Sequence, residues 1–405
     1  MRSGAYGPSG VQGQSPWPYL NRRHAMLGGL NLLALAGCAT AGPGYDAVPP
    51  LAPVRARADR IFDVTVCLRP FRAAGPRLDT EQIGDTLVVH NYGHGGSGWS
   101  LSWGSSAVAV RKAMAGSPRK VAVVGCGALG LTSAILAQRA GAQVTIYARE
   151  FLTQTRSVRA TGTWSPDSRI ALTSAMAPGF GALWEEMART SFKAYRSYLG
   201  LPGSPVEWND RYILSDVSME EAARNSPKDP LGFAHFDDRI RDISPDYEVV
   251  PQGASPFPTR YVRRSSSMMF NIADYGHTLV SDFFAAGGRF ERREFFAPGD
   301  LAGLPEKVVI NCPGYGGRAL WKDESIVPVR GQIAWLIPQP EVNYGLYYHD
   351  VSVLARRDGI VVQSLAGGEM QGYGDDHEVP NRREAEGAVA IVADLYARRW
   401  GFGRV

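Results

Sequence analysis

A glycine-rich turn in the middle of the chain has the composition and spacing of a phosphate-binding site. It reads Gly125-Cys126-Gly127-Ala128-Leu129-Gly130, which is a GxGxxG pattern. The first glycine permits a tight turn, the second lets the backbone approach a pyrophosphate, and the third lets a helix pack closely on a strand. A helix that starts here adds backbone donors and the positive end of its dipole. The candidate dinucleotide-binding residues are therefore Gly125, Gly127, Ala128, Leu129 and Gly130.

The elements that this chemistry requires flank the turn on both sides. Lys120–Val124 is a short β-branched run typical of a buried parallel strand, and Gln143–Tyr147 resembles a second one. Between them, Leu131–Arg139 has a helical pattern. Glu150 lies about 20 residues after the last glycine, where an acidic side chain accepts hydrogen bonds from ribose hydroxyls. The complete unit favours a dinucleotide site over a purely structural glycine turn, which is the alternative.

A small, polar and cationic segment follows the second strand, between residues 151 and 166. Its first half offers donors for a second phosphate, and Ala160–Trp164 could run close under a flat ring. The candidate cofactor residues of this region are Arg156, Ser157, Gly162 and Thr163, together with Phe295 farther along the chain.

Four more segments carry a resemblance to a known family. A buried strand, Lys307–Ile310, ends in Asn311-Cys312-Pro313-Gly314, and Arg330-Gly331-Gln332-Ile333 comes after it. Upstream lie Leu68-Arg69-Pro70 and the run His90-Asn91-Tyr92-Gly93-His94-Gly95-Gly96-Ser97-Gly98. In these segments the chain resembles the flavin-dependent D-amino-acid oxidase family, and all the motifs together cover most of residues 62–368.

The resemblance implies a cofactor, a substrate class and roles for residues. FAD would be the cofactor, with Arg69 holding the substrate carboxylate and the residues after His94 wrapping the flavin ring. The amides of Gly95–Gly98 would stabilise negative charge at flavin N1 and the C2 carbonyl. The residues carried over to the flavin are Gly95, Gly96, Ser97, Gly98, Trp99 and Ser100.

The activity that the resemblance implies is oxidative deamination of a D-amino acid. A hydride would pass from Cα to flavin N5, and the imino acid would hydrolyse to a 2-oxo acid and ammonia. Oxygen would reoxidise the flavin to give hydrogen peroxide, or a membrane acceptor would take the electrons. The alternatives are an oxidase of glycine, sarcosine or an N-substituted amino acid, a dehydrogenase, and an FAD-binding lipoprotein without catalysis.

The order of the segments departs from that family. The family begins with the GxGxxG unit and finishes with the Arg-Pro and His-Asn-Tyr-Gly segments, whereas here the finishing segments come first. We interpret this as a circular permutation, with the old ends joined through Gly116-Ser117-Pro118. Such a joint costs little, because domain termini commonly lie close together at the surface.

A second departure concerns the tyrosines that usually help to bind the carboxylate after the Arg-Gly-Gln motif. Here the corresponding stretch is Tyr344-Gly345-Leu346-Tyr347-Tyr348-His349, and it gives no unique match. Tyr347 and Tyr348 are the candidates for substrate contact, and ordinary packing of strand aromatics is the alternative.

These patterns predict an α/β fold with a Rossmann-like FAD-binding domain and a mixed-sheet substrate-binding cap. We expect the FAD-binding domain to comprise residues 60–165, 260–325 and 358–405. The cap would comprise residues 168–258 and 326–357.

The N-terminal segment has the layout of an export signal. Arg22-Arg23 precedes a short apolar run, Leu27–Ala36, and Leu35-Ala36-Gly37-Cys38 resembles a lipobox. The apolar run is too short to span a bilayer, which needs about 20 residues. We therefore expect residues 1–38 to be a twin-arginine signal peptide of a bacterial envelope lipoprotein, anchored through Cys38 and followed by a linker over 39–59. A buried helix is the alternative.

Composition excludes several other classes. With 44% hydrophobic and 20% charged residues among 405, the chain is neither disordered nor a polytopic membrane protein. A formal net charge of +4 is too balanced to indicate nucleic-acid binding. The four cysteines are far apart, so they predict neither a zinc site nor a disulfide framework, and we expect no metal. His90 and His94 are assigned to packing and hydrogen bonding rather than to a metal.

Overall fold

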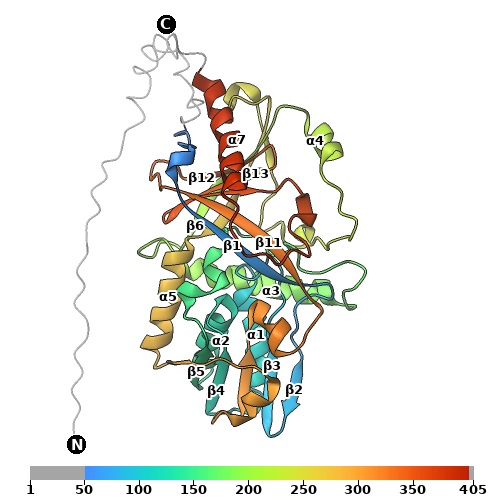
Figure 1. The fold of residues 1–405 in the computed structure, drawn as a ribbon, viewed down its shortest axis with the longest axis vertical. Helices are drawn as coiled ribbons and strands as arrows, with labels where there is room; N and C mark the ends of the chain where they lie inside the picture. Colours follow the sequence, from blue (N-terminus) through green and yellow to red (C-terminus); the bar gives the residue numbers. More distant parts are fainter. Residues whose placement is uncertain (1–50, 401–405) are drawn as a thin grey trace, which may run out of the picture. The chain divides into compact units, whose positions relative to one another are not determined.

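Two β-sheets organise the molecule, as the computed structural model shows (Figure 1). The structure describes residues 51–400, with side chains through residue 398. The six-stranded sheet has the order β2-β3-β10-β4-β5-β9, and the eight-stranded sheet has the order β1-β11-β14-β13-β12-β6-β8-β7. This arrangement confirms the predicted α/β class. The predicted signal peptide and lipobox, with Cys38, lie outside the described residues.

The six-stranded sheet carries the Rossmann-like unit. Its strands are β2 (Thr80–Ile83), β3 (Thr86–His90), β4 (Lys120–Val124), β5 (Gln143–Ala148), β9 (Arg289–Arg292) and β10 (Val308–Asn311). All neighbouring pairs are parallel except the edge pair of β2 and β3. Val121, Val123 and Ile146 are completely or almost completely buried, which explains why the sequence of these strands is nearly continuously apolar.

Helices α1 (Ser102–Ala113), α2 (Ala128–Arg139) and α5 (Ile272–Ala285) pack in sequence beside this sheet, α2 between the other two (Figure 1). Helix α3 (Phe180–Tyr195) lies against α1. Two shorter helices are α4 (Met219–Asn225) and α6 (Gly317–Leu320). In the described range, no helix combines the length and apolar composition that crossing a membrane would require.

The eight-stranded sheet is mixed and mostly antiparallel. Its strands are β1 (Ile61–Arg72), β6 (Val206–Ser215), β7 (Glu248–Val250), β8 (Tyr261–Phe270), β11 (Ile326–Leu336), β12 (Tyr344–Tyr348), β13 (Val351–Arg356) and β14 (Gly359–Ser364). Strands β12 and β6 form its parallel pair. Helix α7 (Arg382–Trp400) covers one face, where Val389, Val392 and Leu395 pack on the strands.

Sheet pairing divides the chain differently from the predicted domains. Strands β1, β8 and β14, and helix α7 that packs on their sheet, were expected in the FAD-binding domain. The structure places them in the eight-stranded sheet, because β1 pairs with β11 along its whole length and β14 pairs between β11 and β13. Hydrophobic patterns identify strands but do not reveal which strand each one pairs with, so this division could not be read from the sequence.

Candidate functional site

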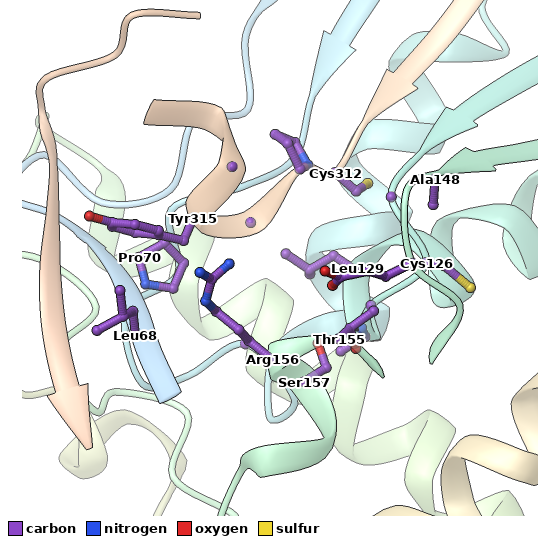
Figure 2. Close-up of a pocket in the computed structure, with 18 of the residues that line it drawn as sticks. Leu68, Pro70, Cys126, Leu129, Ala148, Thr155, Arg156, Ser157, Cys312 and Tyr315 are labelled. Carbon is purple, nitrogen blue, oxygen red and sulfur yellow. Dashed lines mark hydrogen bonds between the residues drawn. The ribbon is translucent and has the colours of Figure 1, made fainter. Parts of the chain in front are cut away.

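A cavity of about 430 Å³ opens between the two sheets (Figure 2). It begins at the carboxyl ends of β4, β5 and β10, and it extends to β1 and β11 of the other sheet. Crevices at the carboxyl ends of parallel strands are where α/β sheets bind ligands, and the volume is typical of small-molecule sites. Of the predicted site residues, the lining contains Arg69, Gly95, Gly96, Gly98, Trp99, Gly125, Gly127, Ala128, Leu129, Glu150, Arg156, Ser157 and Phe295.

The GxGxxG turn follows β4 and leads into α2, as the spacing predicts. Gly125 has a φ of +99°, which disfavours other residues, and a Cβ on it would collide with the backbone carbonyl of Cys312. A Cβ on Gly127 would lie 2.6 Å from Oγ of Ser157. No side chain caps the helix at Gly127, and the amide of Ala128 donates to Oγ of Ser157 (3.1 Å). The start of α2 is therefore a narrow backbone cradle, suited to a pyrophosphate.

Gly130 serves the fold of the turn rather than the cavity wall. A Cβ there would collide with the carbonyl oxygen of Gly125, so the glycine permits α2 to pack against the turn. This is the role that the GxGxxG pattern predicts for its third glycine.

The end of the cavity next to β5 and β9 carries paired charges. Arg149 donates to Glu150 (2.9 Å from Nη2 to Oε1) and to Glu294 (3.1 Å from Nη1 to Oε1). Both carboxylates and Arg149 line the cavity, beside Phe295 and the well exposed Phe296. Glu150 therefore lines the cavity, and Arg149 shares its carboxylate, while its predicted ribose contact stays a prediction.

The flavin-wrapping segment uses its amides differently from the expectation. The amides of Gly95, Gly96 and Ser97 donate to the carbonyls of Pro70, Ser168 and His94, each at 2.9 Å. These three were expected to stabilise charge on the flavin, but they hold the loop instead. The next three amides in this segment of the described structure, those of Gly98, Trp99 and Ser100 just before α1, have no acceptor. These are the available donors at this end of the cavity.

Trp99 connects the wrapping segment to the phosphate end. Its Nε1 donates to the carbonyl of Ser157 (2.7 Å), and its ring lies 5.4 Å from that of Tyr275. Ser157 thus accepts two hydrogen bonds, one from Trp99 through its carbonyl and one from the first amide of α2 through its hydroxyl. The two predicted cofactor segments are thus physically joined.

Four further predicted cofactor residues support the wall without lining it. Oγ of Ser97 donates to the carbonyl of Ser168 (3.0 Å), and Oγ of Ser100 accepts from the amide of Ser165 (2.9 Å). Gly162 has a φ of +89°, and its carbonyl accepts from the amide of Phe270 (2.7 Å). Thr163 forms a β-bridge with Met269. Their side chains or backbones tie the lining loops to β8 and to one another.

The two histidines of the His-x-x-x-His pattern are held in separate networks. His90 contacts Glu81 (Nε2 to Oε2, 3.1 Å) and accepts from Asn311 (3.1 Å), and burial lowers its pKa. His94 is fully buried, and desolvation lowers its pKa to about 3. Ser105 donates to Asn91 (2.6 Å), so its oxygen accepts the Nε2 proton of His94 (2.7 Å). His94 is therefore neutral, with an unprotonated Nδ1 that has no donor in the described part of the chain.

Arg69 projects into the cavity from β1 as a cation without a partner. No hydrogen bond or ion pair to its guanidinium is found in residues 51–398, whereas Arg72 bonds Ser325 (2.8 Å) and lies 3.4 Å from Asp323. Arg77 is likewise bonded to Asp79 (2.8 Å). Burial lowers the pKa of Arg69, and the like charge of Arg169 lowers it further. A desolvated cation with no carboxylate of its own is a site for an external anion.

Arg156 also lines the cavity, but it has a partner that the sequence did not suggest. Its Nε and Nη2 donate to the two carboxylate oxygens of Glu378, each at 2.7 Å. Its guanidinium lies 5.3 Å from the ring of Tyr315. The predicted phosphate donor is therefore present at the cavity, bound on one side by a carboxylate.

The structure does not bring Tyr347 and Tyr348 to the cavity. The hydroxyl of Tyr347 donates to Asp350 (2.6 Å), and that of Tyr348 donates to Asp216 (2.8 Å). Tyr348 is buried in the cluster beneath α7, on the far side of the sheet from the cavity-lining Ile333. Neither tyrosine is among the lining residues, so ordinary packing, the alternative, describes their placement.

Several lining residues were not predicted as site residues. They include Cys67, Leu68, Pro70, Arg149, Arg159, Gly331 and the turn Cys312–Gly316. The turn follows β10, which is the parallel neighbour of β4. A strand that ends beside the GxGxxG turn at the same sheet edge was the signal that could have identified it.

The charges and the shape of the cavity fit a dinucleotide flavin. The lining holds five arginines (Arg69, Arg149, Arg156, Arg159 and Arg293) against two glutamates (Glu150 and Glu294). This excess of positive charge matches a diphosphate and a substrate carboxylate. The glycine cradle leaves room for backbone approach, and the amides of Gly98 and Trp99, which line the cavity, are donors for a ring carbonyl.

Comparison with known proteins decides the family. The model of the FAD dependent oxidoreductase family (DAO) matches residues 120–402, well over half of the chain. The chain belongs to this family. Its cofactor is accordingly FAD, and the family is one of oxidoreductases.

Curated relatives include D-amino-acid oxidases of three organisms. The protein is 48% identical to that of Dictyostelium discoideum over 286 residues, 68% of this chain and 72% of the relative. It is 30% identical to that of Rubrobacter xylanophilus over 220 residues, 53% of this chain and 58% of the relative. The oxidase of Streptomyces coelicolor is 28% identical over 231 residues, 57% and 63% of the two chains. The matches thus span about three fifths of the two bacterial relatives.

Solved structures with a similar fold include glycine oxidase from Geobacillus kaustophilus (13% identity, TM-score 0.45, 69% of this chain and 78% of that chain). An L-amino acid deaminase from Proteus vulgaris is 12% identical, with a TM-score of 0.45, over 70% of this chain and 76% of the other.

Proposed function

We propose that this protein catalyses the oxidative deamination of D-amino acids to 2-oxo acids and ammonia. The observation that carries the proposal is Arg69, a buried guanidinium without a partner in the described structure, at the end of an FAD cavity. The names of the curated relatives support a D-amino acid as the substrate. The chemistry that FAD supplies when bound is two-electron oxidation of the Cα–N bond.

Arg69 would hold the substrate carboxylate through two parallel charge-assisted hydrogen bonds. A planar guanidinium offers this fork, and a lysine does not. Because Arg69 is desolvated and lies near Arg169, binding an anion relieves the cost of burying its charge. The carboxylate is thereby fixed at β1, which orients Cα toward the ring-binding end of the cavity, where the free amides of Gly98 and Trp99 lie.

The cavity offers no strong general base near Arg69. His94 lines the cavity with an unprotonated Nδ1, but desolvation lowers its pKa to about 3, which makes it a weak base. The two glutamates of the cavity, Glu150 and Glu294, are both bonded to Arg149 on the β5–β9 side. Burial raises the pKa of the Cys67 thiol, so that thiol stays protonated. The chain therefore favours a substrate that arrives with a neutral amine, whose lone pair assists departure of the Cα hydride. Oxygen or a membrane acceptor would take up the electrons.

Anaerobic reduction of the flavin tests this function directly. The purified holoprotein should lose its yellow colour when a D-amino acid is added without oxygen, and it should form hydrogen peroxide under air. Bleaching by glycine or sarcosine but by no D-amino acid would indicate an amine oxidase of that type. No bleaching by any amine would leave an FAD-binding protein without this catalysis.

The carboxylate role of Arg69 needs matched variants. Arg69→Ala should lower the rate at low substrate by about two to four powers of ten, because it removes two charge-assisted bonds. Arg69→Lys should recover only part of that loss. Arg72→Ala, which removes a paired arginine on the same strand, should reduce its flavin at a rate close to that of the wild type. An Arg69→Ala protein that is reduced as fast as the wild type would end the carboxylate assignment.

We also propose that the chain is exported as a twin-arginine lipoprotein of a bacterial envelope. Arg22-Arg23, the short apolar run and Cys38 support this proposal. The twin-arginine route carries folded proteins, which suits a chain that must bind FAD before export. Full export of an Arg22→Lys, Arg23→Lys variant would contradict the route, and membrane association that survives Cys38→Ser would contradict the anchor.

A further inference from the structure

Glu378 connects the eight-stranded sheet to the cofactor side of the cavity. It belongs to the segment after β14, whereas its partner Arg156 belongs to the segment after β5. The two side chains form a bidentate pair, with both donor–acceptor distances at 2.7 Å. Figure 2 shows Arg156 reaching between the Leu68–Pro70 strand and the turn that carries Cys126 and Leu129. The ion pair thus links the cavity-lining Arg156 to a segment outside the cavity that follows β14.

The Arg-Gly-Gln motif of β11 fixes the segment that carries Glu378. Nε of Arg330 donates to the carbonyl of His377 (3.0 Å), and its Nη2 donates to the carbonyl of Val379 (3.2 Å). These carbonyls flank Glu378 on both sides. Gln332 exchanges two hydrogen bonds with the backbone of Asn381, at 2.6 and 3.0 Å. The backbone that carries Glu378 is therefore hydrogen-bonded to side chains of β11 at three residues, His377, Val379 and Asn381.

Arg156 is fixed equally well from the cofactor side. Its guanidinium lies beside the ring of Tyr315, which belongs to the lining turn after β10. The next residue, Ser157, bonds the first amide of α2 through Oγ and Trp99 through its carbonyl. A displacement of Arg156 would therefore be transmitted to the pyrophosphate cradle.

The charges keep this pair ionised. The hydrogen bond from Arg156 lowers the pKa of Glu378, and the charges of Arg156, Arg159 and Arg149 lower it further. The two side chains are each about one third exposed, at 33% and 35%. An ion pair at such a position is partly screened by salt, so its contribution can be tested by ionic strength.

We propose that Glu378 is a positioning residue that holds Arg156 across the cavity and thereby slows the release of FAD. Arg156 lines the cavity beside Tyr315, and Glu378 bonds it from the segment after β14. Separation of the pair would free Arg156 and, through Ser157, loosen the cradle at the start of α2. The carboxylate acts on the cofactor through Arg156, since Glu378 itself is not a lining residue.

The rate of FAD release tests the proposal without any substrate. The holoproteins are freed of unbound FAD and diluted, and the rise in fluorescence of released FAD is followed at low and high salt. Glu378→Gln should release FAD about tenfold faster than the wild type at low salt. Salt should accelerate release from the wild type and have little effect on the variant. Glu378→Asp, which keeps the charge on a shorter side chain, should be intermediate.

Two controls separate this role from a general loss of charge or structure. Asp376→Asn removes the same charge from the same segment at a well exposed position, and its release rate should equal that of the wild type. Arg156→Gln and the double variant Arg156→Gln, Glu378→Gln should release FAD at the same rate, because Glu378 acts only through Arg156. Release from Glu378→Gln at the wild-type rate would overturn the proposal. Slower release would overturn it too, since it would mean that Glu378 competes with the FAD phosphates for Arg156.

Discussion

Gly331 of β11 lies directly under the guanidinium of Arg69. A Cβ on this glycine would lie 2.6 Å from Cζ of Arg69 and 2.5 Å from its Nη2. Strands β1 and β11 pair in this region, with Cys67 opposite Gly331 and Arg69 opposite Val329. The arginine therefore reaches the cavity by lying across the bare backbone of the neighbouring strand. Any other residue at position 331 would displace the group that we assign to the substrate carboxylate.

Gly331→Ala should therefore weaken carboxylate binding while leaving FAD in place. We expect the dissociation constant of a small unreactive carboxylate, such as acetate, to rise about ten- to a hundredfold, which corresponds to the loss of a hydrogen bond to a charged group. The perturbation of the flavin absorbance spectrum measures this constant without turnover.

Gly345→Ala is the matched control for that experiment. Gly345 lies on β12 of the same sheet, and a Cβ there would lie 3.0 Å from the carbonyl of Val353, far along the sheet from Arg69. If Gly345→Ala weakened the carboxylate as much as Gly331→Ala, the effect would come from strain in the sheet. If Arg69→Ala left the dissociation constant of acetate unchanged, Arg69 would not be the residue that binds the carboxylate.

The sequence predicted the local elements of the Rossmann-like unit almost to the residue. The predicted strand Lys120–Val124 is β4, and the predicted helical segment Leu131–Arg139 lies within α2, Ala128–Arg139. These elements have strong hydrophobic patterns and end at glycine turns or polar segments, so local physics determines them. Gly125, Gly127, Ala128 and Leu129 line the cavity for the same reason, since one short motif forms both the turn and the start of the helix.

What the sequence did not predict depends on contacts between distant segments. Glu378 could not be recognised as the partner of Arg156, because only the pairing of β11 with the segment after β14 brings it there. The amides of Gly95–Ser97 looked available, but they are taken by carbonyls from Pro70 and Ser168, remote in the chain, and from His94. Tyr347 and Tyr348 had the right residue type, and only the sheet shows that their hydroxyls are bonded to aspartates away from the cavity.

Gly127→Val should abolish FAD binding. The added side chain would enter the space between Gly127 and Oγ of Ser157, where a Cβ alone would lie at 2.6 Å. It would therefore block the approach of the pyrophosphate to the α2 amides. A folded but colourless protein is the expected outcome, as measured by circular dichroism and flavin absorbance. Normal flavin content in this variant would contradict the assignment of the cradle.

Burial of neutral His94 should make the stability of the protein depend on pH in the acid range. Its pKa is lowered to about 3 in the folded state, whereas an unfolded histidine titrates near its ordinary value of 6.5. Between these values the unfolded chain binds one more proton, so the free energy of unfolding falls as the pH falls. The slope from this residue is about 1.4 kcal/mol per pH unit. His90, whose pKa is also lowered, adds to the slope in the same direction.

Denaturant unfolding of the apoprotein at several values between pH 4 and 6.5 would measure this slope. His94→Gln can still donate to Ser105 but cannot titrate, so it should flatten the dependence by about one proton. Equal slopes for the wild type and His94→Gln would show that His94 is protonated in the fold.

The last prediction concerns the order of the segments. The family match begins at residue 120, the first residue of β4, yet residues 61–113 form β1, β2, β3 and α1, which are integral to both sheets. The described chain also brings its two ends together. The hydroxyl of Tyr344 donates to the carbonyl of Ala52 (2.8 Å) and bonds the hydroxyl of Tyr396 (2.5 Å). Only the short joint at 114–119 separates α1 from β4.

We therefore expect that the segments can be relinked in the order of the family without loss of the FAD site. A relinked chain would start at residue 118, run to residue 398, continue through a short glycine–serine linker to residue 52, and end at residue 116. Every strand would keep its neighbours, and the closeness of Ala52 and Tyr396 means that the linker need not strain either element. This chain should fold, bind FAD and show the same anaerobic bleaching as the natural order.

As a control, opening the chain inside β11, between Gly331 and Gln332, should abolish FAD binding, because it cuts the strand that lies under Arg69 and bonds the Glu378 segment. If the relinked chain failed to fold while its linker was long enough to be unstrained, the interpretation of the sequence as a circular permutation would be wrong.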